Sequence, residues 1–239
     1  MNSIPRKNPP NMKTPITVIL ADDHTIVRQG LRALLNVESD IQVIAEAENG
    51  RETVEIAAKL SPDVLVMEIA MPLLNGLEAT RQILKSSPKT KILILTAHGD
   101  DAYVTQAMSL GARGFLVKQT AAHVLPEAIR QVHRGSVFFS PAISQRLIQN
   151  QQNSQQSGKP KTAVAIVKLT SRETEILQLV AEGLANKQSA AELNISIKTV
   201  EKHRQSLMQK LNIHDTAGLT RYAISVGIIE SSVQVTILE

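Results

Sequence analysis

The sequence contains no cysteine and no tryptophan among its 239 residues, and aromatic residues make up only 2% of it. Without cysteine, the chain forms no disulfide, no thiolate zinc site and no catalytic thiol. The shortage of aromatic rings argues against a single-strand nucleic-acid groove in which bases stack on side chains. No apolar run approaches the ~20 residues that cross a bilayer, and residues 1–15 lack the apolar core of a secretory signal. We therefore predict a cytoplasmic protein with no membrane segment.

A strong excess of charge of one sign is also missing, since 26 Lys and Arg stand against 22 Asp and Glu. The basic excess lies at the two ends: residues 1–15 hold three basic and no acidic residues, and residues 159–239 hold ten basic and eight acidic ones. This balance permits nucleic-acid binding without establishing it. The hydrophobic fraction of 43% is enough to fill folded cores, and the length favours two domains.

Short apolar runs alternate with amphipathic segments over residues 16–134. The runs are rich in Val, Ile and Leu and apolar on both faces, as strands of a buried parallel sheet are. Five such β–α units predict a doubly wound α/β fold, with a parallel five-stranded sheet and helices on both faces. The predicted strands are Ile16–Ala21, Ile41–Ala45, Val64–Met67, Ile92–Thr96 and Gly114–Val117, and the predicted helices are 25–36, 51–60, 76–86, 101–110 and 121–134.

A polar, Gln-rich tract at 149–162 indicates a linker by its composition. Only helical patterns follow it: Thr170 and Glu173 have capping-box spacing, and Ser196 is placed to cap a later helix. Two short helices joined by a tight turn are typical of a helix-turn-helix, so we predict a second, all-α domain of that kind. The predicted boundaries are a flexible tail at 1–15, the α/β domain at 16–134, a short helix and polar linker at 135–167, the helix-turn-helix domain at 168–229 and a C-terminal extension at 230–239.

Charged and polar side chains stand at the ends of four predicted strands. Asp22 and Asp23 follow the first strand, Glu68 follows the third, Thr96 ends the fourth and Lys118 follows the fifth. Because ligands of such sheets bind beyond the carboxyl ends of the strands, we expect these side chains to meet in one crevice. Adjacent carboxylates suit Mg²⁺, and a lysine with a hydroxyl suits an anionic phosphoryl group. The alternative is that the acids only cap helices and the lysine is an ordinary surface residue; their joint occurrence favours the site.

Residues 16–134 resemble a bacterial response-regulator receiver domain in the order and spacing of several segments. The resemblance implies that Asp22, Asp23 and the Ala70 carbonyl bind a weakly held Mg²⁺, and that Thr96 and Lys118 contact a phosphoryl group. The matching segments are Ala21-Asp22-Asp23-His24, Met67-Glu68-Ile69-Ala70-Met71-Pro72 with Asn75-Gly76, Leu95-Thr96-Ala97, and Gly114-Phe115-Leu116-Val117-Lys118.

The same resemblance makes Phe115 the aromatic side chain that turns inward on activation, and it implies a sensor histidine kinase as the partner. It fails at one position, because the family's phosphoacceptor is an aspartate and the matching residue here is Glu68. The extra methylene moves the carboxylate outward by roughly one C–C bond, about 1.5 Å, and in-line transfer tolerates such misplacement poorly. Three interpretations stay open: an introduced phosphomimic, which we favour, a natural receiver that no longer takes phosphate, and a working acceptor.

The helix predicted at 197–211 has an apolar stripe, which we expect to pack inward, and a polar stripe on the opposite side. Lysine and glutamine on the polar stripe are side chains that read guanine and adenine edges. An ordinary solvated face is the alternative, and the position of the stripe after the predicted turn favours DNA recognition. The apolar stripe consists of Val200, Leu207 and Leu211, and the polar stripe of Lys198, Lys202, Gln205 and Gln209.

Residues 168–229 resemble the LuxR-type helix-turn-helix of the NarL/FixJ subfamily. The matching segments are Leu169-Thr170-Ser171-Arg172-Glu173, Ala181-Glu182-Gly183-Leu184-Ala185-Asn186-Lys187 and Ser196-Ile197-Lys198-Thr199-Val200-Glu201-Lys202-His203. One departure is Ser189-Ala190, where the family usually has Ile-Ala. The resemblance implies that this domain binds double-stranded DNA, with phosphate contacts that position it without reading sequence. The candidate DNA-binding residues are Lys198, Thr199, Glu201, Lys202, His203, Gln205, Lys210, Lys187 and Arg172.

These observations predict a bacterial response regulator of a two-component system. We expect a transcription factor, not an enzyme, that binds DNA as a homodimer, because paired helices read half-sites about one turn of DNA apart. A second hypothesis is a phosphorylation-independent regulator with a degenerate receiver, which differs only in its input. A remote third is a Mg²⁺-dependent phosphohydrolase of similar topology, against which the attached helix-turn-helix argues.

Overall fold

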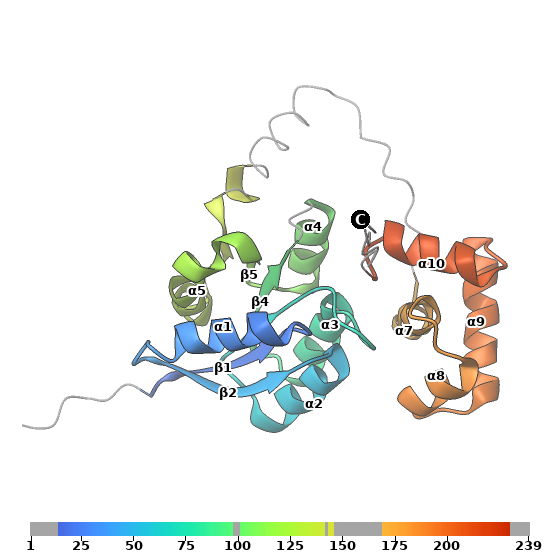
Figure 1. The fold of residues 1–239 in the computed structure, drawn as a ribbon, viewed down its shortest axis with the longest axis horizontal. Coiled ribbons are helices and arrows are strands. Elements are labelled where there is room, and N and C mark those ends of the chain that lie inside the picture. The colour runs from blue at the N-terminus through green and yellow to red at the C-terminus, as the bar shows by residue number, and fades with distance from the viewer. Residues whose placement is uncertain (1–13, 98–100, 142, 146–168, 230–239) are drawn as a thin grey trace, which may run out of the picture.

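The computed structural model describes residues 14–97, 101–141, 143–145 and 169–229, except for the side chains of 101 and 102. Most of the predicted 1–15 tail, the polar tract at 149–162 and the 230–239 extension therefore lie outside the described residues. The described chain forms an α/β region before the gap at 146–168 and a helical region after it (Figure 1).

Six parallel strands form one sheet. They are β1 (Ile16–Ala21), β2 (Ile41–Ala47), β3 (Val64–Met67), β4 (Lys91–Thr96), β5 (Gly114–Val117) and β6 (Phe138–Phe139). Their order is β2-β1-β3-β4-β5-β6. The prediction of five strands was one short, because β6 pairs with β5 at the sheet edge and its two residues are too few to show a strand pattern.

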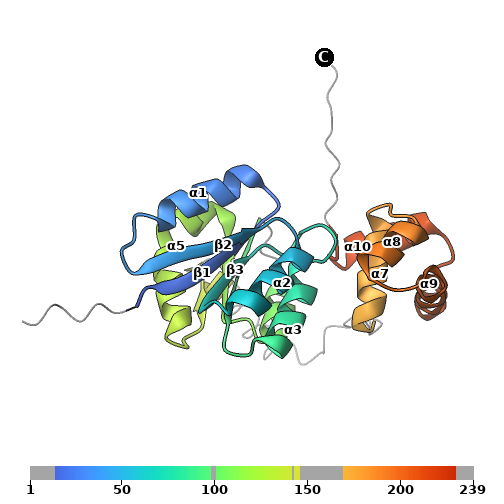
Figure 2. The same ribbon diagram turned by 90° about the horizontal axis from the view of Figure 1, so that it is seen from below.

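Helices cover both faces of the sheet, which confirms the doubly wound prediction (Figure 2). Val18 and Leu20 of β1 point into the core on one face, whereas Ile19 and Ala21 point into the core on the other. Both faces are apolar because both are covered. The helices over the first face are α1 (Thr25–Leu35) and α5 (Lys118–His133), and those over the second are α2 (Gly50–Leu60), α3 (Gly76–Ser86) and α4 (Asp101–Leu110).

The second region is all-helical, as predicted, and its helices begin at capping residues. The hydroxyl of Thr170 accepts from the Glu173 N–H and the Glu173 carboxylate accepts from the Thr170 N–H, which is the predicted capping box. Ser196 and Asp215 cap the last two helices by accepting from the N–H groups of Thr199 and Gly218. The four helices are α7 (Ser171–Ala181), α8 (Asn186–Glu192), α9 (Ile197–Leu211) and α10 (Thr216–Ser225).

The apolar stripe of α9 packs inward: Val200 and Leu207 are fully buried, in a core with Ile176 of α7 and Leu219 of α10. Figures 1 and 2 both place α7 on the side of the α/β region and α9 at the far end of the molecule. Within the described residues, no helix has the length and apolar character that a membrane span requires.

Candidate functional site

Four of the side chains that the sequence placed in one crevice meet at the carboxyl edge of the sheet. Asp22 directly follows β1, Glu68 directly follows β3, Thr96 ends β4 and Lys118 opens α5. Since β1, β3, β4 and β5 are neighbours, their ends lie together. Asp22, Glu68 and Thr96 are each at most 3% exposed, so the crevice is a buried polar site.

Lys118 forms ion pairs with two buried carboxylates at once. Its Nζ lies 2.6 Å from Oδ2 of Asp22 and 2.7 Å from Oε2 of Glu68. The other Glu68 oxygen, Oε1, accepts a hydrogen bond of 2.6 Å from the Ile69 N–H. Thr96 also hydrogen-bonds the Glu68 carboxylate. Both oxygens of Glu68 are therefore held by donors.

Burial raises the pKa of Glu68, and the Lys118 ammonium, the Thr96 hydroxyl and the Ile69 N–H offset part of that rise. For Lys118, burial acts to lower the pKa, but the carboxylates of Glu68 and Asp22 outweigh it, so the pKa is raised. The ammonium therefore stays charged at neutral pH and compensates two carboxylates that would otherwise be buried without a cation.

A group of cation ligands lies beside Lys118. Asp22, Asp23 and His24 each offer one ligand atom, and these atoms lie within 4.8 Å of one another. Ala70, the other ligand predicted, donates its N–H to Glu68 Oε1 at 3.3 Å. Its carbonyl oxygen is the third ligand that the receiver resemblance implies. Carboxylate and carbonyl oxygens are the donors that Mg²⁺ prefers, so these residues fit the metal.

Phe115 lies on β5 with its side chain fully buried. It packs in the core that also contains Met67 of β3 and Ile94 of β4. This is the inward orientation that the receiver resemblance associates with activation.

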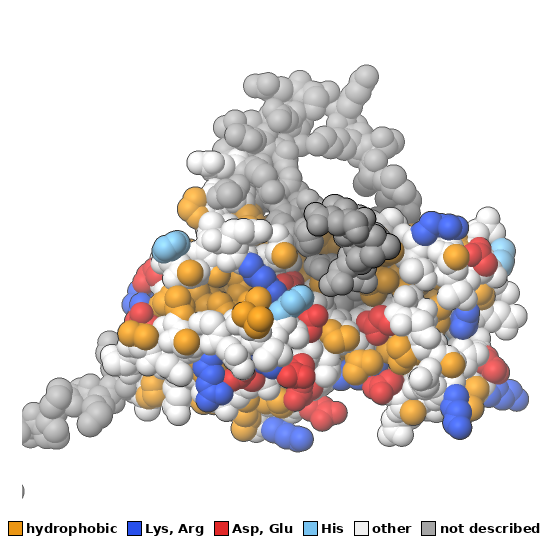
Figure 3. All heavy atoms as spheres, in the orientation of Figure 1, with side chains coloured by type: hydrophobic (Ala, Val, Ile, Leu, Met, Phe, Trp, Pro, Cys, Tyr) orange, Lys and Arg blue, Asp and Glu red, His pale blue; other side chains and the backbone are white. Residues whose placement is uncertain are grey.

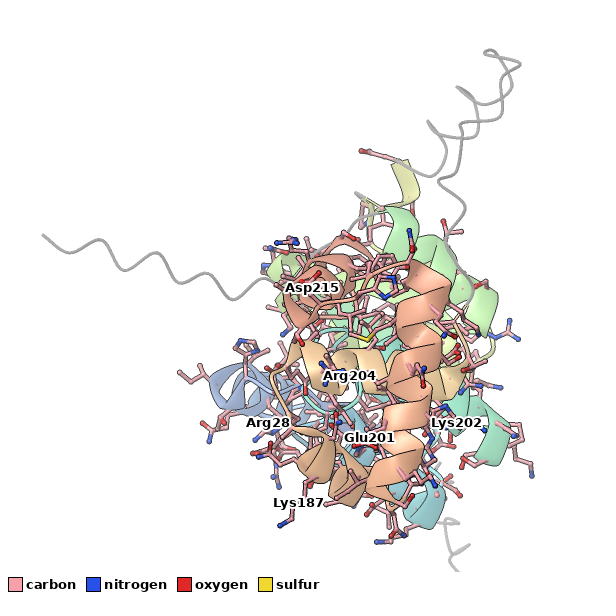
Figure 4. The ribbon with its side chains drawn as sticks, turned by 90° about the vertical axis from the view of Figure 1, so that its right-hand side faces the viewer. Arg28, Lys187, Glu201, Lys202, Arg204 and Asp215 are labelled. Atoms are coloured by element: carbon pink, nitrogen blue, oxygen red, sulfur yellow. The ribbon has the colours of Figure 1, made fainter. Side chains whose placement is uncertain are left out.

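The polar stripe of α9 is exposed at the end of the molecule away from the sheet. Lys198, Lys202 and Gln205 are exposed and make no hydrogen bond or ion pair with any described residue. Glu201 is likewise exposed, and Figure 4, which looks onto this end, shows Glu201 and Lys202 on different flanks of α9, with Lys187 of α8 on the same side as Glu201. Figure 3 shows Lys and Arg side chains interspersed with Asp and Glu over this end rather than gathered into one patch.

Other predicted DNA contacts already have partners inside the domain. Lys210 Nζ lies 2.7 Å from Oε2 of the buried Glu173. Arg172 Nη1 pairs with Glu175 at 2.8 Å. The Thr199 hydroxyl hydrogen-bonds that of Ser196, its own N-cap residue, at 2.8 Å. His203 is half-buried and Lys187 is exposed.

The loop that follows Glu68, between β3 and α3, contacts α7. The Gln178 amide donates to the Met71 carbonyl at 2.8 Å and accepts from the Asn75 N–H at 2.7 Å. Glu182 accepts from the Leu73 N–H at 3.1 Å. One side chain of α7 and that of its C-cap residue, Glu182, therefore bind three main-chain groups of this loop.

Leu73 of the same loop has a φ of 66°, in the left-handed region that a leucine rarely adopts. Such a conformation costs about 1–3 kcal/mol and persists only where the surroundings fix it. Here the Leu73 side chain packs against the core of the helical domain, while its N–H is bound by Glu182. The helical domain thus holds the loop next to the buried crevice in a strained shape.

Sequence reasoning did not single out Gln178, Glu182 or Arg28, a buried arginine of α1 described below. No local pattern identifies Gln178, because its partners in the β3–α3 loop lie more than 100 residues away in the chain. Arg28 did leave a signal: with Leu31 and Leu35 it has the spacing of one helical face, and an arginine on an apolar face requires a buried partner.

Two family models match the chain, one in each region. Residues 18–130 match the response regulator receiver domain. Residues 167–223 match the bacterial regulatory proteins of the luxR family.

Relatives and solved structures match across both regions. The chain is 36% identical over 210 residues to the transcriptional regulatory protein DegU of Brevibacillus brevis, which covers 84% of this chain and 89% of that protein. It is 38% identical over 208 residues to the transcriptional regulatory protein LiaR of Bacillus subtilis, covering 87% of this chain and 96% of that protein. The RcsB response regulator of Salmonella typhimurium matches with a TM-score of 0.58 at 28% identity, over 90% of this chain and 99% of that one. A structure of RcsB in complex with DNA matches with a TM-score of 0.55 at 29% identity, over 89% and 100% of the two chains.

Proposed function

Since the chain belongs to the response regulators that join a receiver domain to a LuxR-type DNA-binding domain, we propose that its receiver pocket controls DNA binding with Glu68 acting as a phosphomimic. The observation that carries the proposal is the environment of the Glu68 carboxylate. Lys118, Thr96 and the Ile69 N–H bind it, and these are donors that suit an anionic phosphoryl group. The inward Phe115 agrees with an activated receiver.

Asp22, Asp23 and the Ala70 carbonyl would hold Mg²⁺, which would supply positive charge to bring a phosphoryl donor and the acceptor position together. Lys118 lies 2.6 Å from Asp22, so its ammonium already satisfies one of the acids, and we expect weak metal binding. Glu68 keeps a carboxylate at the acceptor position but supplies one charge, where a phosphoryl group supplies nearly two. Glu68 therefore reproduces only part of the negative charge of a phosphorylated acceptor.

The signal passes to the DNA-binding domain through the loop between β3 and α3. Oε1 of Glu68 binds the N–H groups of Ile69 and Ala70 at the start of this loop. Gln178 of α7 and Glu182, the residue that follows α7, bind the Met71 carbonyl and the N–H groups of Leu73 and Asn75 further along the loop. A change at Glu68 therefore reaches α7 through a short loop that is hydrogen-bonded at both ends.

On the DNA side, Lys202 and Gln205 read base edges, because they lie mid-helix on the exposed stripe of α9. Lys198 in the first turn and Lys187 on α8 contact phosphates. Glu201, Thr199 and His203 border this stripe, while Arg172 and Lys210 contribute mainly to the domain's own packing through Glu175 and Glu173. The protein acts in the cytoplasm as a homodimer on double-stranded DNA, and its input partner is a sensor histidine kinase.

A phosphorylation-independent regulator is the second candidate, and one observation favours it. Lys118 is already engaged with both Asp22 and Glu68, so the ammonium that would contact a phosphoryl group is paired before one arrives. This candidate shares the DNA-binding function and differs in whether the charge at Glu68 controls DNA binding.

Intact-protein mass spectrometry after acetyl phosphate treatment tests whether Glu68 is a working acceptor, and DNA binding by Glu68→Gln separates the two candidates. We expect no phosphoryl adduct on the parent chain and an adduct on Glu68→Asp, which restores the family's acceptor. We also expect Glu68→Gln, which removes the charge and keeps the shape, to weaken DNA binding by the parent at least several-fold. Glu55→Gln, an exposed change on α2, is the matched control. An adduct on the parent that disappears in Glu68→Gln would show a working acceptor and overturn the phosphomimic. Undiminished DNA binding by Glu68→Gln would instead favour the second candidate.

A further inference from the structure

An arginine is buried behind the acidic pocket. Arg28 lies in the second turn of α1 and is 6% exposed; Figure 4 labels it on the receiver, behind the DNA-binding domain. Lysine and arginine are almost never fully buried unless they are paired. The contacts of Arg28 therefore indicate what its burial achieves.

The guanidinium of Arg28 makes three different contacts. Nη1 donates to the main-chain carbonyl of Asp22 at 2.6 Å. Nε donates to Oε2 of Glu46 at 3.0 Å, and Nη2 donates to Oε1 of Glu48 at 2.6 Å. Glu46 lies on β2 and Glu48 in the loop that follows it. One planar group thus joins the ends of β1 and β2 to α1.

Arg28 contacts Asp22 just beyond the end of β1, where the hydrogen bonds between strands stop. β1 ends at Ala21, so the Asp22 carbonyl lies beyond the ladder and needs another donor. The N–H of Asp22 still donates to the Ala47 carbonyl at 3.1 Å. Both main-chain polar groups of Asp22 are therefore bound. β2 holds the peptide before Asp22 through its N–H, and Arg28 holds the peptide that joins Asp22 to Asp23 through its carbonyl.

We propose that Arg28 is a positioning residue for the Asp22–Asp23 carboxylate pair. It acts through the main-chain carbonyl of Asp22 and sets the direction in which the two carboxylates leave the chain. The inference rests on the proposed metal-binding role of this pair. Groups that orient metal ligands from behind typically change metal affinity by 10–100-fold when they are removed.

Charge alone predicts the opposite effect. A guanidinium close to a cation site repels the cation, so its removal through charge alone should tighten Mg²⁺ binding. Glu46 and Glu48 would then be left without Arg28 and would attract the metal further. A positioning role predicts weaker binding despite this attraction. The sign of the change in Mg²⁺ affinity therefore distinguishes the two roles.

The test uses the full chain and Mg²⁺ alone, titrated by calorimetry and by amide chemical shifts at Asp22 and Asp23. Arg28→Lys keeps the charge but loses the planar fork, and Arg28→Gln loses the charge. We expect both to bind Mg²⁺ on the order of ten times more weakly than the parent. Arg32→Gln is the matched control, because Arg32 lies on the same helix and pairs with the same Glu46 without touching Asp22. We expect it to stay within about twofold of the parent.

A second measurement does not depend on the metal. In metal-free protein, amide hydrogen exchange at Asp22, Asp23 and His24 should be at least several-fold faster in Arg28→Lys, while exchange in β3 stays unchanged. Equal or tighter Mg²⁺ binding by both Arg28 variants would overturn the proposal, as would an equal rise of exchange throughout the sheet. Failure of the parent itself to bind Mg²⁺ would remove the proposed metal site, and the exchange measurement would still decide whether Arg28 fixes these residues.

Discussion

The receiver pocket and the exposed stripe of α9 use charged side chains in opposite ways. In the pocket, Asp22 and Glu68 are at most 3% exposed and both lie within 2.7 Å of the Lys118 ammonium. On α9, Lys198 and Lys202 are exposed and have no partner among the described residues. Buried charges must be compensated by the fold itself, whereas exposed charges remain available to a ligand. Substitutions in the pocket should therefore affect folding, and substitutions on α9 should affect DNA binding.

The largest expected effect is in the pocket. Lys118→Met leaves Asp22 and Glu68 buried without a cation, and breaking such a pair costs about 3–5 kcal/mol. We expect the receiver to lose stability of that size, measured by hydrogen exchange of β3 and β4 in the full chain, with α7–α10 as the internal reference. A second substitution, Glu68→Gln, should recover part of the loss because it removes one of the two carboxylates.

Lys85→Met on α3 is the control for this change, since Lys85 is exposed and makes no ion pair with a described residue. Surface changes of this kind usually stay within ±0.5 kcal/mol. If Lys118→Met destabilises the receiver no more than Lys85→Met does, Lys118 is not needed to compensate the buried carboxylates. The contrast between the two regions then fails.

The sequence does not always predict which charged side chains are free to bind a ligand and which are paired within the fold. Lys210 was a candidate for a DNA phosphate contact within the LuxR-type resemblance, but it is bound to Glu173, which is 3% exposed. Burial acts to raise the pKa of Glu173, but hydrogen bonds from Lys210, the Thr170 N–H and Ser206 outweigh it and lower the pKa to about 2. Like Lys118 in the pocket, Lys210 compensates a buried carboxylate, although it lies in the DNA-binding domain.

The second prediction tests that assignment through pH. A lowered pKa means that the unfolded chain binds the proton more readily, so the stabilisation by Glu173 is complete above about pH 5 and is lost as pH falls toward 2. We expect the DNA-binding domain to lose roughly 2–3 kcal/mol over this window, measured by urea denaturation at a series of pH values. Lys210→Met should reduce the loss. Glu201→Gln, an exposed change on α9, should leave it unaltered, and equal pH profiles for the parent and Glu173→Gln would refute the assignment.

Strong local patterns explain why so much of the fold was predictable. Ile16–Ala21, Val64–Met67 and Gly114–Val117 are strands with the predicted bounds, because each is a buried run closed by polar residues. The Thr170 capping box was found for the same reason, since its two residues lie three apart. The predicted start of α5 at 121 was three residues late, because Lys118 looked like the end of a strand and in fact opens the helix.

Contacts between the two domains could not be predicted from the sequence, although contacts between the strand ends could. Asp22, Glu68, Thr96 and Lys118 could be placed together because parallel strands bring their carboxyl ends to one edge. No such rule links Gln178 to the loop after Glu68. That contact depends on how α7 packs against the receiver, and neither segment carries a periodic or motif signal for the other.

The smallest expected effects are on α9, where Lys202 and Gln205 should fail in a different way from Lys198. A side chain that reads a base edge should, on replacement by alanine, cost about 1–3 kcal/mol of binding and relax the preference at one base pair. A side chain that touches only phosphate should weaken binding to all sequences alike and lower the salt slope by about one. We expect Lys202→Ala and Gln205→Ala to show the first behaviour, because both lie in the middle of α9, and Lys198→Ala in the first turn to show the second.

The measurement is binding to a selected site and to random DNA at two salt concentrations, with circular dichroism to verify folding. Val200→Ala is the contrasting variant, because Val200 is fully buried and its truncation should destabilise the domain before it alters any preference for sequence. Lys187→Ala, on the neighbouring α8, should behave like Lys198→Ala if both contact phosphate. Should Lys202→Ala and Gln205→Ala remain folded and bind both DNAs as the parent does, the recognition surface lies elsewhere. The exposed stripe would then be an ordinary solvated face, and the difference between α9 and the pocket would be one of burial alone.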